Sequence, residues 1–278
     1  MQRMRGRPVT PALDHTRRLL DTPPTPPIPG QLDLKEHTVT SLPAREPNGL
    51  RVLDTYSCSG GMAMGYYLAG YDVVGVDINP QPHYPFEHHV GDAVQFIREH
   101  GADFDFIHGS PPCQAYTPLN AYNHKTYPDL IAPTREAMLA TGRPYVIENV
   151  EAAAPELNEP TLLCGPMFGL KVYRHRLFET NWHLTAPDHA KHTAICTRNG
   201  YLPTDQRPFM TITGGRHSRA WQNAACDAMG MPWIKVPASG DIKLGIREVC
   251  EAIPPAYAKW IGEQAAAVLT ADPVPAAA

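Results

Sequence analysis

The chain has 278 residues, enough for one sizeable α/β core and a small appendage. Its formal net charge of −4 argues against a generally basic nucleic-acid coat protein, although it does not exclude a local basic face. The six cysteines are scattered without a Cys-x2-Cys pair, and no apolar run approaches the roughly 18 residues of a membrane span. Because the sequence also shows no secretory signal, we expect a cytoplasmic protein with reduced thiols and no membrane partner.

Both ends of the chain have the composition of disordered segments. Residues 1–48 contain nine prolines and no sustained periodicity, and residues 270–278 are rich in alanine and proline. Such segments bury too little apolar surface to offset the entropy of ordering. We therefore predict a disordered proline-rich arm over 1–48 and a disordered tail over 270–278.

The first predicted elements form a strand, a glycine turn and a helix. Residues 51–56 predict the strand, and residues 57–61 predict a turn into a helix that continues to Leu68. This unit suits a nucleotide-like ligand, because glycines let the backbone approach it and the helix start offers free N–H groups. A second strand, 73–77, ends in Asp77, whose carboxylate is placed to accept the hydroxyl groups of a ribose. An ordinary helix cap is the alternative role for such an acid.

A cysteine and a glutamate follow two later strands of the predicted sheet. The apolar run 104–107 predicts a buried strand, and the loop after it presents Cys113 behind two prolines that stiffen the backbone. A stiff loop at a sheet's carboxyl edge suits a nucleophile, whereas a lone cysteine is otherwise a small buried apolar residue. After a predicted helix over 129–141, the strand 144–147 brings Glu148 to the same edge, where a carboxylate must be paired or chemically active.

The second half of the chain carries the surplus of basic residues. Residues 171–219 contain eight lysines and arginines against three acids, and they lack clear periodicity. Arg174 and Arg176 alternate with other residues as on a strand, so they point to one face, either toward a ligand or toward solvent. Further helices are predicted over 220–231 and 256–269. The histidines and cysteines between 164 and 196, namely Cys164, His183, His189, His192 and Cys196, match no strong zinc spacing, so we predict no metal site.

Five pieces of this sequence, in this order, resemble the DNA cytosine-5 methyltransferases. They are the glycine turn, Pro112-Cys113-Gln114, Glu148-Asn149-Val150, Arg174-His175-Arg176 and the return segment 250–255. The resemblance covers roughly residues 50–180 and 244–264, and in style it is closest to the short solitary enzymes carried by phages. It implies a Rossmann-like α/β fold of S-adenosylmethionine-dependent methyltransferases, with a mostly parallel sheet and helices on both faces. The implied parts are a core over 49–178, a small basic target-recognition insert over 179–219, and a return segment with closing helix over 220–269.

The resemblance also implies the reaction. A methyl group would pass from S-adenosylmethionine to carbon 5 of cytosine in double-stranded DNA, through a covalent adduct of Cys113 with a base flipped out of the duplex. Glu148 would contact ring nitrogen 3 and the amino group, Arg176 the carbonyl oxygen at carbon 2, and Arg174 would support the loop. We expect a monomer when it acts on DNA, in a bacterial or phage-infected cytoplasm. The target sequence and the existence of a partner nuclease in a restriction–modification pair stay open.

Binding residues follow from the same resemblance. Cofactor binding is assigned to Tyr56, Ser57, Cys58, Ser59, Gly60, Gly61, Asp77, Ile78, Asp92, Ala93, Pro112, Glu251 and Ala252, with Asp92 receiving the adenine amino group. Substrate binding is assigned to Gln114, Thr117, Asn149, Arg198, Arg207, Arg216 and Arg219. Three residues depart from the family pattern. Cys58 replaces a glycine of the turn, Val172 replaces a glutamine before the arginine pair, and Glu251 replaces a cofactor-contacting asparagine.

Two other functions are compatible with these residues. Ser110-Pro111-Pro112 matches three positions of the loop that holds the exocyclic amine in amino-directed methyltransferases, but Cys113 stands where that loop has an aromatic residue. The chain could also be a non-catalytic DNA-binding protein or decoy that keeps the fold and has lost cofactor affinity through Cys58 and Glu251.

Overall fold

The computed structural model describes residues 42–116 and 127–271. Most of the predicted arm, the predicted substrate residue Thr117 and the tail from residue 272 lie outside these ranges. The described end of the predicted arm, 42–48, contacts the core, because Arg45 pairs with Asp72 and lies over the ring of Tyr67. The arm therefore ends earlier than residue 48.

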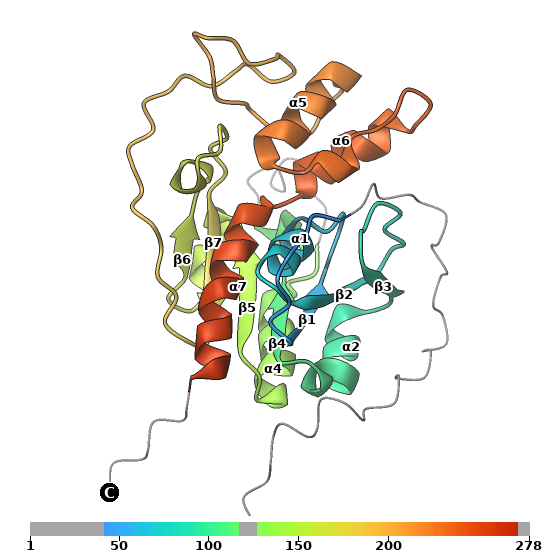
Figure 1. Ribbon diagram of the computed structural model, residues 1–278, viewed down its shortest axis with the longest axis vertical. Coiled ribbons are helices and arrows are strands. Elements are labelled where there is room, and N and C mark those ends of the chain that lie inside the picture. The colour runs from blue at the N-terminus through green and yellow to red at the C-terminus, as the bar shows by residue number, and fades with distance from the viewer. Residues whose placement is uncertain (1–41, 117–126, 272–278) are drawn as a thin grey trace, which may run out of the picture. The chain divides into compact units, whose positions relative to one another are not determined.

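A single seven-stranded sheet forms the centre of the molecule (Figure 1). Its strands lie in the order β3-β2-β1-β4-β5-β7-β6. Neighbours from β3 to β5 pair in parallel, whereas β7 is antiparallel to both β5 and β6. This confirms the mostly parallel sheet predicted from the sequence. The strands are β1 Arg51–Thr55, β2 Asp72–Asp77, β3 Glu87–Val90, β4 Phe106–Gly109, β5 Tyr145–Asn149, β6 Thr161–Leu163 and β7 Arg176–Thr180.

The register of the parallel strands brings the predicted site residues to one edge of the sheet. Thr55 lies beside Val76 on one side and Gly109 on the other, and Gly109 lies beside Ile147. The segments that follow these strands therefore leave the sheet next to one another. A ligand site at this carboxyl edge is the usual arrangement in open α/β sheets.

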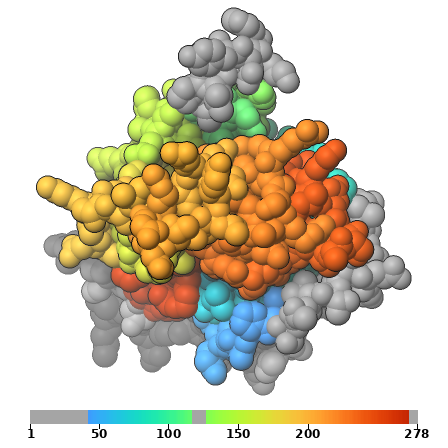
Figure 2. All heavy atoms as spheres, turned by 90° about the horizontal axis from the view of Figure 1, so that it is seen from above, coloured from blue at the N-terminus to red at the C-terminus, as the bar shows by residue number. Residues whose placement is uncertain are grey.

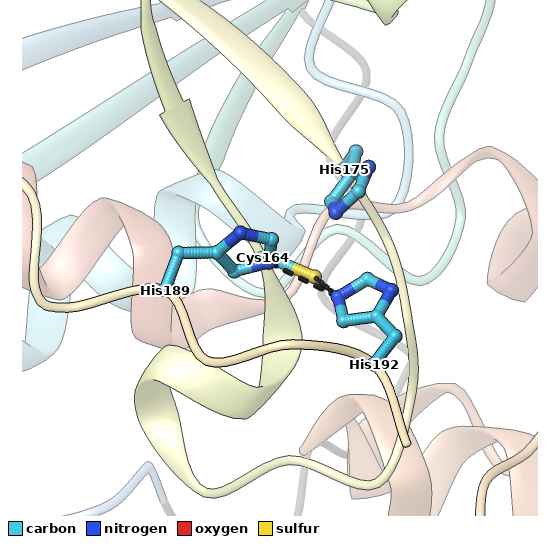
Figure 3. Close-up of side chains that lie close together, drawn as sticks. All are labelled: Cys164, His175, His189 and His192. Atoms are coloured by element: carbon cyan, nitrogen blue, oxygen red, sulfur yellow. Dashed lines mark hydrogen bonds between the residues drawn. The ribbon is translucent and has the colours of Figure 1, made fainter. Parts of the chain in front are cut away.

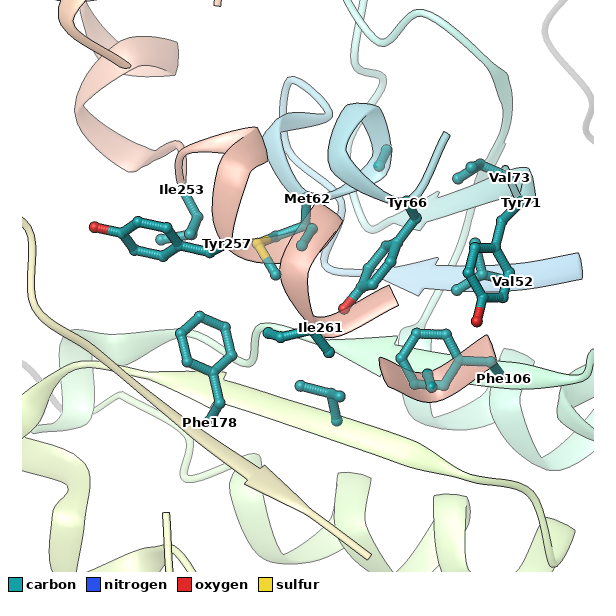
Figure 4. Packing of buried hydrophobic residues seen from close by; sticks show 14 of the residues in the cluster. Val52, Met62, Tyr66, Tyr71, Val73, Phe106, Phe178, Ile253, Tyr257 and Ile261 are labelled. Atoms are coloured by element: carbon teal, nitrogen blue, oxygen red, sulfur yellow. The ribbon is translucent and has the colours of Figure 1, made fainter. Parts of the chain in front are cut away.

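Helices cover both faces of the sheet (Figure 1). On one face lie α1 Gly61–Leu68 and α7 Pro255–Thr270, and on the other lie α2 Ala93–His100 and α4 Ile131–Thr141. Because both faces are covered, the central strands β1, β2, β4 and β5 are buried along almost their whole length. Figure 4 shows the first layer, where the buried rings of Tyr66, Phe106 and Tyr257 pack between the sheet and the two helices.

The contact between α1 and α7 depends on glycine. A Cβ atom on Gly61 would overlap the backbone carbonyl of Ile253, and one on Gly65 would overlap that of Pro255. The same junction is held by Tyr71, whose hydroxyl donates to the carbonyl of Gly262 at 3.0 Å. The backbones of the two helices thus approach more closely than larger residues would permit.

A third apolar cluster lies beyond the carboxyl edge, around the fully buried Trp221. It is built by α5 Arg219–Met229 and α6 Ile242–Glu251 (Figure 1). Figure 2 looks down on this side, where the segments coloured gold to orange spread over the core. Short 3-10 helices occur at η2 Gly101–Asp103, η3 Cys113–Ala115, η4 Glu151–Glu156, η5 Gly165–Phe168 and η6 Pro232–Ile234.

Two predicted boundaries need correction. Helix α6 was not predicted within the return segment, and the predicted insert over 179–219 begins too early. Glu179 and Thr180 belong to β7, where the buried Glu179 carboxylate accepts hydrogen bonds of 2.6 Å from Nε and Nη2 of Arg135. The loop-rich insert is therefore 181–218. Among the described residues, no helix combines the length and apolar character needed to cross a membrane.

Candidate active site

A pocket of about 380 Å³ opens at the carboxyl edge of the sheet. This size is typical of sites for small-molecule ligands. Its wall is formed by the ends of β1, β2 and β5, by the loop after β4, and by the end of α6. The predicted site residues that line it are Tyr56, Ser57, Cys58, Gly61, Asp77, Ile78, Pro112, Cys113, Gln114, Glu148, Asn149, Arg176, Glu251 and Ala252.

The turn after β1 is held by the carboxylate of Asp77. One of its oxygens accepts from the backbone N–H of Cys58 at 3.1 Å, and the other accepts from that of Asn79 at 3.0 Å. Cys58 adopts a left-handed φ of 44° and Tyr56 one of 57°. Cys58 thus takes the backbone conformation expected of the glycine it replaces, at a strain cost of about 1–3 kcal/mol. The turn geometry survives the departure from the family pattern.

Ser59 and Gly60 support the turn from outside the pocket. Gly60 has a φ of 80° and is the N-cap of α1, and the carbonyl of Ser59 accepts from the indole N–H of Trp233 at 3.0 Å. Asp92 and Ala93 are not among the described lining residues of the pocket. Asp92 instead caps α2, accepting from the backbone N–H of Gln95 at 2.8 Å. The structure thus shows Asp92 in the role of a helix cap, which was the alternative drawn from the sequence.

Cys113, Glu148 and Arg176 converge at the pocket. The Nε atom of Arg176 lies 3.0 Å from Oε1 of Glu148, and the charges of both groups shift the pKa of Cys113. Burial, followed by the charge of Glu148, raises the pKa of Cys113, whereas the charge of Arg176 lowers it. The thiol therefore stays protonated at neutral pH in this arrangement, and its reactivity depends on the balance of its two charged neighbours.

The carboxyl group of Glu148 binds a proton more readily than usual. Burial raises its pKa, against the opposing effects of Arg176, a hydrogen bond with Ser110, and Arg174. A chain of hydrogen bonds continues from Ser110 into the core. The Oγ atom of Ser110 lies 2.9 Å from Nε2 of His108, and Nδ1 of the same ring lies 2.9 Å from the hydroxyl of Tyr66. Burial lowers the pKa of His108 to about 3, so this ring is neutral. A buried carboxyl that can hold a proton suits a general acid.

Arg174 supports the site without lining the pocket. Its Nη2 donates to the carbonyl of Cys250 at 2.7 Å, and its own carbonyl accepts from the hydroxyl of Tyr257 at 2.7 Å. Burial and the neighbouring charge of Arg176 lower the pKa of Arg174 to about 9. Arg174 therefore ties the segment before β7 to the end of α6.

Asn149 holds the loop that carries the cysteine. Its Nδ2 donates to the carbonyl of Pro111 at 2.9 Å, and its Oδ1 accepts from the backbone N–H of Val150 at 2.9 Å. The side chain is almost fully buried. These bonds support a positioning role for Asn149, which also lines the pocket, and the exposed Gln114 lies at the pocket rim.

The four arginines predicted to contact DNA differ in their surroundings. Arg198 and Arg216 are exposed, and Arg207 is exposed with one donor to the carbonyl of Cys196 at 2.8 Å. Arg219 is half-buried and donates to four backbone carbonyls, those of Val236, Pro237, Ala238 and Gly240. Arg219 is thus held against the loop 236–240 beside the α5–α6 cluster, unlike the three exposed arginines.

The sequence analysis missed several polar residues of the pocket, namely Asp54, Asn79, Gln81, Ser110 and Arg247. Asp54 lies on the predicted first strand, shortly before the glycine turn, and this position was the available signal. Burial raises its pKa well above the usual range, and it accepts from the hydroxyl of Tyr84 at 3.1 Å. Arg247 lies on the unpredicted α6, where its charge opposes the rise that burial causes in the pKa of Glu251.

Comparisons with known proteins agree with this architecture. No family model and no curated protein matches the sequence. Among solved structures, the S. pombe Dnmt2 methyltransferase superposes with a TM-score of 0.53 at 15% identity, covering 80% of this chain and 99% of that one. The Entamoeba histolytica methyltransferase EhMeth gives a TM-score of 0.52 at 13% identity, with coverage of 80% and 99%. This likeness supports the resemblance drawn from the sequence motifs, and the chain has the Rossmann-like fold of these methyltransferases.

Proposed function

We propose that this chain transfers a methyl group from S-adenosylmethionine to carbon 5 of cytosine in double-stranded DNA. The observation that carries the proposal is the convergence of Cys113, Glu148 and Arg176 at one pocket on the carboxyl edge of the sheet. A thiol beside a proton-holding carboxyl and a guanidinium is the donor set that attack on a pyrimidine ring requires.

The residues of the pocket fit the proposed methyl donor. The carboxylate of Asp77 suits ribose hydroxyls, and Tyr56 and Ile78 offer an aromatic and an exposed apolar side chain beside the expected adenine position. Pro112, Glu251 and Ala252 complete the wall near the cysteine loop. When bound, S-adenosylmethionine supplies an electrophilic methyl group on a sulfonium.

The protein's own residues then account for the steps at the base. Cys113 gives its proton to solvent and its sulfur bonds to carbon 6, which makes carbon 5 nucleophilic. Meanwhile Glu148 donates a hydrogen bond to ring nitrogen 3 and Arg176 holds the carbonyl oxygen at carbon 2. After methyl transfer, carbon 5 loses its proton to solvent base, the ring electrons return, and the Cys113 thiolate leaves. The thiol must approach the face of the ring, so the base leaves the helix stack at a cost of a few kcal/mol.

The insert 181–218 is the proposed DNA-recognition region. It contains the exposed Arg198, Arg207 and Arg216 and borders the α5–α6 cluster beside the pocket. Exposed guanidinium groups can grip phosphates and read guanine edges in the major groove. We propose a monomer acting in the cytoplasm of a bacterial or phage-infected cell.

The decisive experiment traps the adduct. Duplex DNA carrying 5-fluorocytosine should form a covalent complex with the protein in the presence of S-adenosylmethionine, because fluorine does not leave as a proton does. Cys113→Ala should abolish the complex, and Cys196→Ser, a control outside the pocket, should keep it. An adduct that persists in Cys113→Ala contradicts the mechanism. An RNA of the same sequence, tested in parallel, reports whether the duplex DNA is the preferred substrate.

One second candidate is favoured by a specific observation. Glu251 stands where the family has a cofactor-contacting asparagine, and it faces the pocket together with Asp77. Two carboxylates there oppose the carboxylate of the proposed cofactor, which favours a DNA-binding decoy without methyl transfer. Calorimetric titration with S-adenosylmethionine separates the two functions, since the decoy shows no binding. Expression in a host without cytosine methylation, followed by bisulfite sequencing, then gives product and target site together.

A further inference from the structure

Four side chains from three separate segments meet beside the arginine pair (Figure 3). Cys164 follows β6 and precedes η5, His175 lies just before β7, and His189 and His192 lie in the insert after β7. Each residue offers one ligand atom, a ring nitrogen or the sulfur, and these four atoms all lie within 4.8 Å of one another. Neither His183 nor Cys196, which the sequence spacing had grouped with them, belongs to this cluster.

Two distances within the cluster are close to the edges of a tetrahedral metal site. Zinc binds nitrogen at about 2.0–2.1 Å and sulfur at about 2.3 Å, so tetrahedral geometry separates two nitrogens by about 3.3 Å and a nitrogen from a sulfur by about 3.6 Å. Nε2 of His192 lies 3.0 Å from Nε2 of His189 and 3.4 Å from Sγ of Cys164. A central ion requires shifts of only a few tenths of an ångström along these edges.

His175 supplies an independent observation. Its Nδ1 lies 3.0 Å from a carboxylate oxygen of Glu151, and its Nε2 is buried without a hydrogen-bond partner in the described part of the chain. A carboxylate on one ring nitrogen fixes the tautomer and leaves the other nitrogen free to bind a metal. A buried nitrogen without a partner is costly unless it has such a ligand.

We propose that Cys164, His175, His189 and His192 bind one Zn²⁺ ion. A thiolate with three imidazoles is a donor set that selects zinc, and four protein ligands close the coordination sphere, which is typical of a structural site. None of the four residues lines the pocket of Cys113. Binding releases the thiol proton of Cys164 to solvent. The sequence-based expectation of no metal site is revised accordingly, because the fold joins residues that are widely spaced in the chain.

The ion has a defined structural task. His175 stands between Arg174 and Arg176, so a metal bond to His175 fixes the backbone that carries both arginines. The ring of His192 stacks on that of Tyr173, with ring centroids 3.7 Å apart, which places the start of the insert against the same segment. Zinc therefore joins the insert to the end of β6 and the start of β7, next to the proposed catalytic site.

The test measures metal in the purified full-length protein. Mass spectrometry of metal content should find one zinc per chain in the unaltered protein and in the controls His183→Ala and Cys196→Ser. Cys164→Ser and His192→Ala should lose most of it, and Glu151→Gln should weaken zinc affinity about 10- to 100-fold, as removal of a ligand's carboxylate partner does. These measurements do not depend on methyl transfer, so their outcome is separate from that of the proposed function.

A spectroscopic measurement covers the case in which a variant fails to fold. The unaltered protein, stripped with a chelator and loaded with Co²⁺, should show the absorption of tetrahedral cobalt with a sulfur-to-metal charge-transfer band. Zinc should abolish that spectrum. The proposal would be overturned by an octahedral cobalt spectrum without the sulfur band. It would also be overturned if Cys164→Ser retained as much zinc as the controls, or if the controls lost as much zinc as Cys164→Ser.

Discussion

Replacement of Asn149 by alanine tests whether this residue positions the cysteine loop or binds substrate. The change removes two hydrogen bonds of 2.9 Å and leaves the carbonyl of the buried Pro111 and the N–H of the half-buried Val150 without their partners. An orphaned buried group costs about 1–3 kcal/mol, and water replaces part of the bond at Val150. We expect a total loss of about 2–4 kcal/mol in the free energy of unfolding.

The kinetic effect should be of similar size. A loosened loop displaces the thiol from its line of attack, and a misplacement of about 1 Å costs about 100-fold in rate. We expect the single-turnover rate of adduct formation on 5-fluorocytosine DNA to fall about 10- to 100-fold, with DNA affinity unchanged. Thermal unfolding should show a lower Tm by roughly 4–16 °C, at about 2–4 °C per kcal/mol for a domain of this size.

Asn181→Ala is the matched control. Asn181 also bridges two backbone groups, accepting from Tyr145 at 2.9 Å and donating to Arg143 at 3.2 Å, but at the opposite end of β5. It is exposed, so its loss should lower Tm less and leave the adduct rate unchanged. Reduced DNA affinity with an unchanged single-turnover rate in Asn149→Ala would refute the positioning role and restore the substrate contact.

Three further predictions follow from the charges around the pocket. Burial and Glu148 raise the pKa of Cys113 above its usual 9.0, so alkylation of this thiol by iodoacetamide should accelerate with pH to beyond pH 9. Glu148→Gln should accelerate the alkylation at a fixed neutral pH, and a slower reaction in this variant would contradict the assignment. A hydrogen bond with the buried carboxylate of Glu248 on α6 raises the pKa of His83 above its usual 6.5. The contribution of this pair to stability is therefore complete below pH 6.5 and disappears as the pH rises through the raised pKa. The Tm difference between the unaltered protein and His83→Gln should accordingly shrink from pH 6 to pH 9, and a constant difference would argue against the charged pair. Asp77→Ala should weaken S-adenosylmethionine binding about 10- to 100-fold by calorimetry, since a hydrogen bond to a charged group contributes about 1.5–3 kcal/mol. Asp92→Ala should cost about 1 kcal/mol of stability through loss of the N-cap and should alter S-adenosylmethionine affinity less.

Much of the core could be predicted because its signals are local. Apolar runs before Asp77, Cys113 and Glu148 gave buried parallel strands, and such strands deliver their last residues to one edge. Helix α6 was missed because Gly245 interrupts its pattern and the family motif had defined 250–255 as a return segment. Its start is nevertheless marked by Asp241, which caps the helix.

The surroundings that the sequence did not reveal belong to residues whose partners are distant in the chain. Arg219 was grouped with the exposed arginines because the carbonyls it binds, at 236–240, belong to a loop without a recognisable pattern. The cluster of Cys164 and His175 was missed for the same reason, since ten residues separate the two and only the pairing of β6 with β7 joins them. Spacing rules detect metal sites within one segment, and this cluster draws on three.

The glycine contact between α1 and α7 has a consequence for synthesis of the chain on the ribosome. The nucleotide-type turn and α1 emerge early, but the surface that covers α1 comes from α7, and Tyr71 and Gly262 are 191 residues apart. Until α7 has been translated, the buried face of α1, which includes Tyr66, stays exposed to solvent. A nascent chain released before Pro255 should therefore be cleaved by protease within α1, while the complete chain should resist. The unit of β1 and α1 is therefore buried only after α7, almost 190 residues later in the chain, has been added.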